Sequence, residues 1–108
     1  MQAFVFDTYA LLEIIAGNPR YERYLDDELI INDFIFAELY YKLIRESGHE
    51  RANFYANRYA PFIKQLDAET IKLAMIFRDQ NKKNNLSATD CISYFMALKL
   101  KIRFLTGD

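Results

Sequence analysis

The stretch that decides the fold is "AFVFDTYALLEIIAG", residues 3–17. Its first four residues form an unbroken apolar run, which is typical of a strand buried on both faces of a parallel sheet. The run ends at Asp7, and the following residues predict a short helix over 8–16 that stops at Gly17. A buried strand that leads through an acid into a helix favours an α/β fold.

The rest of the chain repeats this alternation. A second apolar run, residues 28–32, precedes a helix predicted from Asn32 or Asp33 to about residue 46, with Gly48 just past its end. Further elements are predicted along the rest of the chain: helices over about 50–60, 68–81 and 88–101, and a strand over 102–105. This order predicts an α/β domain with a mostly parallel central sheet flanked by helices.

Length and composition bound the class of protein. The 108 residues suffice for one domain, and 52% apolar residues exclude a disordered chain. The single cysteine, Cys91, cannot form an internal disulfide, so we expect a buried core thiol in a cytoplasmic protein. No apolar run approaches the roughly 20 residues of a membrane span, so no membrane association is expected.

The charges are unevenly distributed. Residues 1–38 hold two basic and eight acidic residues, whereas residues 39–107 hold twelve basic and six acidic ones. An acidic cleft with a basic rim would suit a metal-dependent site that acts on a polyanion. Ordinary solvated helix faces explain the same distribution equally well.

Three acids, Asp7, Glu38 and Asp90, stand where solvated charge is not the easy explanation. Asp7 ends the first buried strand, where ligands bind in parallel sheets, although it could simply cap the next helix. Glu38 has Phe34 and Tyr41 on its side of a helix, although an i,i+4 pair with Lys42 is the ordinary alternative.

The third of these acids, and a fourth that says little by itself, lie in the C-terminal part of the chain. Asp90 comes three residues after Ser87, a spacing that a capping box explains fully. Asp108 follows the third strand through Thr106 and Gly107. Together with the first two acids, these carboxylates would suit Mg²⁺ or Mn²⁺, which prefer oxygen ligands. The lone His49 and the absence of zinc-ligand spacing or glycine-rich phosphate loops favour no other chemistry.

Four segments resemble the motif blocks of PIN-domain nucleases, in the order and at about the spacing of that family. They are "FVFDTYALLEI", "INDFIFAELYYKLI", "LSATDCISYFMALKLKI" and "RFLTGD". The closest resemblance is to VapC-type toxins of prokaryotic toxin–antitoxin pairs. It implies a three-layer PIN-like fold and a divalent-metal-dependent endoribonuclease, with Mg²⁺ or Mn²⁺ as cofactor. It also implies a homodimer and a VapB-like antitoxin that blocks the site.

The resemblance assigns roles to individual residues. The family's four metal-binding catalytic acids fall on Asp7, Glu38, Asp90 and Asp108, and two hydroxyl positions beside the site fall on Thr8 and Thr106. Charge alone suggests that four basic side chains contact RNA: Lys42, Arg45, Arg51 and Arg58.

Two departures from the family pattern bear on function. Tyr9 stands where the family usually has a small polar residue. The family also continues beyond the "TGD" acid, so we expect one PIN-like domain over residues 1–108 that lacks the C-terminal strand and helix. Two alternatives therefore remain open: a catalytically impaired PIN-like domain that binds RNA or a protein partner, and a PIN nuclease of RNA processing.

Overall fold

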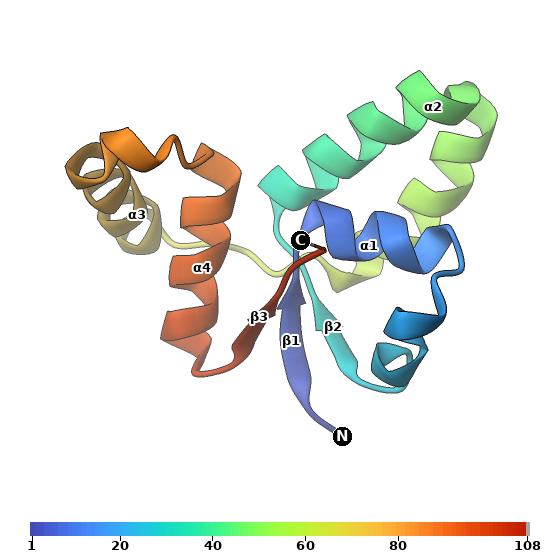
Figure 1. The fold of residues 1–108 in the computed structure, drawn as a ribbon, viewed down its shortest axis with the longest axis horizontal. Coiled ribbons are helices and arrows are strands. Elements are labelled where there is room, and N and C mark those ends of the chain that lie inside the picture. The colour runs from blue at the N-terminus through green and yellow to red at the C-terminus, as the bar shows by residue number, and fades with distance from the viewer. Residues whose placement is uncertain (108) are drawn as a thin grey trace.

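A parallel sheet organises the chain (Figure 1). The structure, a computed structural model, describes residues 1–107. Within that range three strands form one sheet in the order β2–β1–β3: β1 (Ala3–Phe6), β2 (Glu28–Ile30) and β3 (Arg103–Leu105). Both outer strands run parallel to β1, with Val5 opposite Ile30 on one side and Phe104 on the other. The carboxyl ends of all three strands therefore lie at one edge of the sheet, here called the carboxyl edge.

Helices flank this sheet and connect its strands. In Figure 1, α1 and α2 lie to the right of the sheet and α3 and α4 to its left. The bounds are α1 (Thr8–Ile15), η1 (Pro19–Tyr24), α2 (Asp33–Tyr59), η2 (Ala60–Phe62), α3 (Ala68–Gln80), η3 (Lys82–Asn84) and α4 (Ala88–Leu100). The predicted α/β fold, with a parallel sheet flanked by helices, is confirmed. Over the described residues, none of the helices combines the length and apolar composition that a membrane span requires.

One boundary differs from the sequence prediction. The second strand ends at Ile30 rather than residue 32, because Ile31 instead forms an isolated bridge with Ile63. The helices predicted before and after Gly48 are both present; they lie within the range labelled α2, which is interrupted by a kink at that glycine. Gly48 has φ 83° and ψ 173°, a conformation that side-chain-bearing residues rarely adopt. We call the parts before and after Gly48 the first and second arms of α2 (Figure 1).

The main core surrounds β1. Val5 and Phe6 are fully buried, and they pack with residues of the two right-hand helices, including Leu11, Ile35 and Leu39. A smaller cluster of Ala74, Cys91 and Ile92 joins α3 to α4. Cys91 is thus a buried core thiol, as the composition suggested.

Candidate active site

Asp7 lies at the carboxyl end of the central strand and is 5% exposed. It caps α1, because its Oδ1 accepts a hydrogen bond from the Ala10 amide at 2.7 Å. The same oxygen accepts the Gly107 amide at 3.2 Å, which ties it to the segment after β3. The capping role and the position at the carboxyl edge therefore coexist, and the backbone on both sides fixes the orientation of this carboxylate.

Asn32 joins the end of β2 to α4 and is completely buried. Its Oδ1 accepts the Ile35 amide at 2.9 Å and thereby caps α2, as the sequence predicted. Its Nδ2 donates to Ser93 Oγ at 3.1 Å and lies 3.6 Å from Met96 Sδ. The sequence indicated only the cap, because nothing local in the chain reveals a partner 61 residues away.

Asp90 lies in the first turn of α4, with its side chain exposed. The predicted cap is present, since the Asp90 amide donates to Ser87 Oγ at 3.0 Å. The helix packs on β1 and β3 and runs into β3, so its N-terminus lies at the carboxyl edge. Asp90 precedes Ser93 by three residues, which places both on the side of α4 that Asn32 contacts.

Glu38 lies in the second turn of α2, half-buried between the core residues Ile35 and Leu39. The ordinary explanation for this acid fails, because Glu38 and Lys42, both within residues 1–107, form no ion pair. The Lys42 ammonium group instead lies 5.2 Å from the centroid of the Tyr9 ring. Glu38 therefore lies on a helix that begins at the carboxyl edge, and Lys42, the cation suggested by the sequence, does not neutralise it.

The two predicted hydroxyl positions also lie at this edge. Thr8 is 2% exposed, and its Oγ1 has no hydrogen-bond partner among the described residues. The Thr106 carbonyl accepts a hydrogen bond from Tyr21 Oη at 3.1 Å. Asp108, the fourth predicted acid, lies outside the described residues.

Tyr21 also takes part in the structure of the carboxyl edge, although the sequence did not indicate it. Burial raises the pKa of its phenol, and the negative charges of Glu13 and Asp7 raise it further. The phenol therefore stays protonated and donates to the Thr106 carbonyl, which holds the segment after β3 against η1. This hydrogen bond could not be predicted from the sequence, because 85 residues separate Tyr21 from Thr106.

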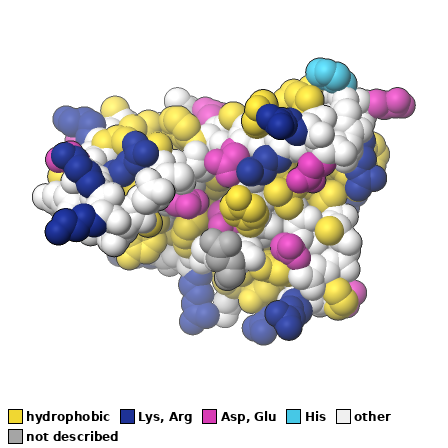
Figure 2. Space-filling view, turned by 45° about the horizontal axis from the view of Figure 1, so that its top comes forward, with side chains coloured by type: hydrophobic (Ala, Val, Ile, Leu, Met, Phe, Trp, Pro, Cys, Tyr) yellow, Lys and Arg dark blue, Asp and Glu magenta, His cyan; other side chains and the backbone are white. Residues whose placement is uncertain are grey.

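The four predicted RNA-contacting cations fall into two groups. Lys42 and Arg45 lie on the first arm of α2, whereas Arg51 and Arg58 lie on the second arm, past the bend at Gly48. Figure 2 shows acidic side chains near the middle of one face, with basic side chains at its left end, toward its upper right and along its lower edge. Lys42 and Arg45 thus share an arm with Glu38, and the other two residues do not.

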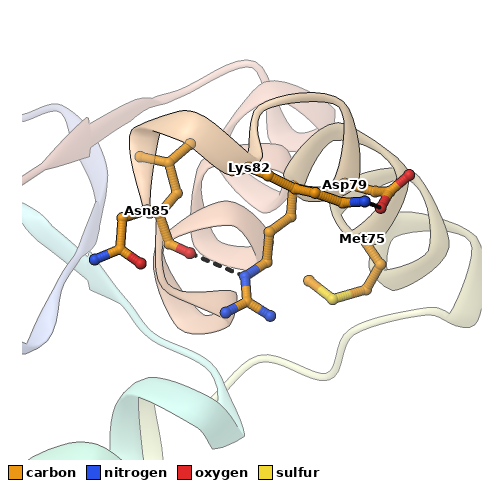
Figure 3. Close-up of a pocket in the computed structure, with 6 residues that line it drawn as sticks. Met75, Asp79, Lys82 and Asn85 are labelled. Atoms are coloured by element: carbon orange, nitrogen blue, oxygen red, sulfur yellow. Dashed lines mark hydrogen bonds and ion pairs between the residues drawn. The ribbon is translucent and has the colours of Figure 1, made fainter.

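A pocket formed by α3 and the turn that follows it contains none of these acids (Figure 3). It is lined by Met75, Arg78, Asp79, Lys82, Asn85 and Leu86. Its cations are already engaged: Lys82 pairs with Asp79 at 3.0 Å, and Arg78 Nε donates to the Leu86 carbonyl at 2.9 Å. These contacts brace the turn between the two helices and explain the polar lining without a ligand.

The donor chemistry at the carboxyl edge fits a hard divalent cation. The candidate ligands are carboxylate and hydroxyl oxygens, and the buried Thr8 hydroxyl still lacks a partner among residues 1–107. Within that same range, no three His, Cys, Asp or Glu side chains form a group that could hold a metal ion by themselves. The metal site predicted from Asp7, Glu38, Asp90 and Asp108 therefore stays a prediction, because the described residues alone do not form it.

The sheet is parallel, a buried acid ends its central strand, and acid-bearing helices begin at the same edge. This arrangement is typical of an α/β domain with a ligand site at the carboxyl ends of its strands. Comparison with family profiles matches the PIN domain over residues 4–108, so the chain belongs to the PIN-domain family. Comparison with curated proteins gives no match.

A solved structure supports the same fold. The chain is similar to VapC20 of Mycobacterium tuberculosis, described as a sarcin-ricin loop cleaving toxin. The TM-score is 0.77 at 19% sequence identity, and the match covers 92% of this chain and 84% of that one. The fold and the family that the four motif blocks indicated are confirmed.

Proposed function

We propose that this chain is an endoribonuclease that hydrolyses RNA phosphodiester bonds with the help of Mg²⁺ or Mn²⁺. In this proposal residues 1–108 form one PIN-like domain, and Asp7, Glu38, Asp90 and Asp108 are the metal-binding catalytic acids. Membership of the PIN-domain family supports the reaction class. The observation that carries the proposal is Asp7, a buried carboxylate at the end of the central strand whose Oδ1 is held by two backbone amides.

The residues at the carboxyl edge have separable tasks in this reaction. A bound divalent cation would supply Lewis acidity toward the scissile phosphate and would make a bound water more acidic. The amides of Ala10 and Gly107 orient the Asp7 carboxylate before any ligand arrives. Tyr21 holds the carbonyl of Thr106 and so keeps the segment after β3 beside Asp7. Lys42 and Arg45 would balance the charge of the RNA backbone.

We further propose that the protein is the toxin of a VapBC-type pair. VapC20, which shares the fold, is described as a toxin that cleaves the sarcin-ricin loop. By analogy, the substrate here is RNA, the inhibitor is a small VapB-like antitoxin that covers the acids, and the active form is a homodimer in the cytoplasm. Co-expression rescue by the neighbouring gene product, together with the mass of the purified complex, tests these partners.

The decisive test of the reaction is the Asp7→Asn variant. Asparagine is also a good helix cap, so α1 keeps its N-terminus while the site loses one charge. We expect RNA cleavage in Mg²⁺ or Mn²⁺ to fall by about 100-fold or more, with the melting temperature nearly unchanged. Cleavage at the parent rate would refute the assignment of Asp7.

Asp67→Asn is the matched control. Asp67 caps α3 through the Thr70 amide at 2.8 Å and pairs with Lys99, so the same substitution removes a capping charge and this ion pair away from the carboxyl edge. We expect this variant to cleave RNA at the parent rate. Titration calorimetry with Mn²⁺ separates the alternatives: the absence of binding by the parent would favour a catalytically impaired PIN-like domain that binds RNA or a protein.

A further inference from the structure

Exposed aromatic rings surround the acid-bearing face of α2. Phe34 and Tyr41 are 40% and 58% exposed, and both lie on the side of the helix that carries Glu38. Tyr9, two residues after Asp7, is 48% exposed although its neighbours Thr8 and Ala10 are buried. Aromatic rings that stay exposed to water add little to the stability of an isolated chain. Exposed patches of this kind commonly mark binding sites.

Two of these rings carry a cation. The Lys42 ammonium group lies 5.2 Å from the Tyr9 centroid. One turn along α2, Arg45 lies 5.7 Å from the Tyr41 centroid and donates from Nη1 to Tyr41 Oη at 3.0 Å. Alternating aromatic rings and cations are the arrangement with which proteins bind unpaired nucleotides, because bases stack on the rings and phosphates pair with the cations.

Tyr9 is fixed relative to the acids. A Cβ placed on Gly107 would lie 2.4 Å from Tyr9 Cβ and 2.6 Å from its carbonyl carbon, so the segment after β3 packs directly on this residue. The Gly107 amide also donates to Asp7. The backbone of Tyr9 is therefore held at the same edge as the acid that precedes it by two positions.

We propose that Tyr9 and Lys42 form a nucleotide subsite, in which an unpaired RNA base stacks on the free face of the Tyr9 ring and Lys42 attracts the adjoining phosphate. This proposal rests on the proposed function and adds to it that the nucleotide beside the cut is unpaired. Tyr41 and Arg45 form a second such pair farther along the same face. Tyr9 is a positioning residue here, since its ring binds a base and takes no part in bond breaking.

The chain contains no tryptophan, so Tyr9→Trp introduces a single fluorescent reporter. We expect a single-stranded oligoribonucleotide, added in EDTA to prevent cleavage, to quench this tryptophan, and a duplex of the same sequence to leave it unchanged. Leu73→Trp is the matched control, because Leu73 is 46% exposed on α3, which carries none of the four cations predicted to contact RNA, and we expect no response there. Equal quenching at the two positions, or none at position 9, would overturn the proposal.

Kinetics on the active chain provide an independent readout. We expect Tyr9→Ala to raise KM for a single-stranded substrate by about 5- to 150-fold while kcat changes little, and Tyr9→Phe to restore KM. Abasic nucleotides scanned along the substrate should raise KM at one position for the parent and at none for Tyr9→Ala.

The outcomes separate the subsite from the reaction. Cleavage by the parent together with an unchanged KM in Tyr9→Ala would refute the subsite and leave the nuclease intact. If oligonucleotides have no effect on the position-9 reporter but a co-expressed antitoxin changes it, the surface binds a protein and the subsite is also refuted. Quenching at position 9 without cleavage by the parent would uphold the subsite and refute the reaction.

Discussion

Replacing Asn32 by alanine is the sharpest test of how the carboxyl edge is held together. The substitution removes the cap of α2, which costs about 1 kcal/mol for a typical asparagine cap. It also leaves Ser93 Oγ, fully buried, without the amide that donates to it, at about 1–3 kcal/mol. The sum is about 2–4 kcal/mol of unfolding free energy, or roughly 8–16 °C in melting temperature for a domain of this size.

Ser87→Ala is the control for this measurement. Ser87 caps α4 through the Asp90 amide at 3.0 Å but is exposed, so its loss should cost only the cap, about 1 kcal/mol. The assay is urea unfolding of both variants and of Ser93→Ala, followed by circular dichroism. A double-mutant cycle of Asn32 with Ser93 should give a coupling of about 0.5–3 kcal/mol. Equal destabilisation by Asn32→Ala and Ser87→Ala would refute the argument that the buried bridge matters.

Two further predictions concern the segment after β3. Gly107→Ala should push this segment off Asp7 and weaken Mn²⁺ binding by about 10- to 100-fold in calorimetry. In the control Gly17→Ala, the φ of +79° strains the backbone and lowers stability, but nothing lies within 4 Å of the added Cβ and Mn²⁺ affinity should stay unchanged. Tyr21→Phe should lower the unfolding free energy by about 1 kcal/mol at neutral pH, through loss of the bond to Thr106. The folded chain raises the pKa of Tyr21 above its ordinary value of 10.0, so the stabilisation by its phenol is complete below that pH and is lost as the pH rises through the folded pKa. The unfolding free energies of parent and variant should therefore converge in alkaline urea titrations. A difference that stays constant with pH would contradict this.

Local patterns accounted for most of the fold. The apolar run before Asp7 predicted β1, the capping residues Asn32 and Ser87 predicted helix starts, and Gly48 predicted the end of the helix before it. These features depend on neighbours a few residues apart, and neighbours are what a sequence displays directly. The same logic predicted Asp7 at a strand end and Glu38 and Asp90 in early turns of helices, and each lies in that element.

Contacts between distant segments could not be predicted in the same way. The bonds from Asn32 to Ser93 and from Tyr21 to Thr106 span 61 and 85 residues, and no periodicity encodes such pairs. Lys42 shows how a local rule can mislead. Its spacing from Glu38 is ideal for an ion pair, yet the ammonium group lies over Tyr9, which the fold brings to the same place from α1. An aromatic ring close enough to compete for a cation is visible only after the helices have packed.

The distribution of buried polar groups bears on the proposal that the carboxyl edge is a functional site. The buried polar or charged residues among positions 1–107 are Asp7, Thr8, Asn32, Thr70 and Ser93. All but Thr70 lie where the ends of β1 and β2 meet α4, so the costliest side chains to bury gather at one edge. Hydrogen bonds offset the cost for Asp7 and Asn32, but the Thr8 hydroxyl has no partner among the described residues. The caps of α1 and α2 account for Asp7 and Asn32, so the Thr8 hydroxyl is the buried polar group that stability alone does not explain. This hydroxyl, which follows Asp7 in the chain and precedes the half-exposed Tyr9, supports the proposal of a ligand with oxygen donors at the carboxyl edge.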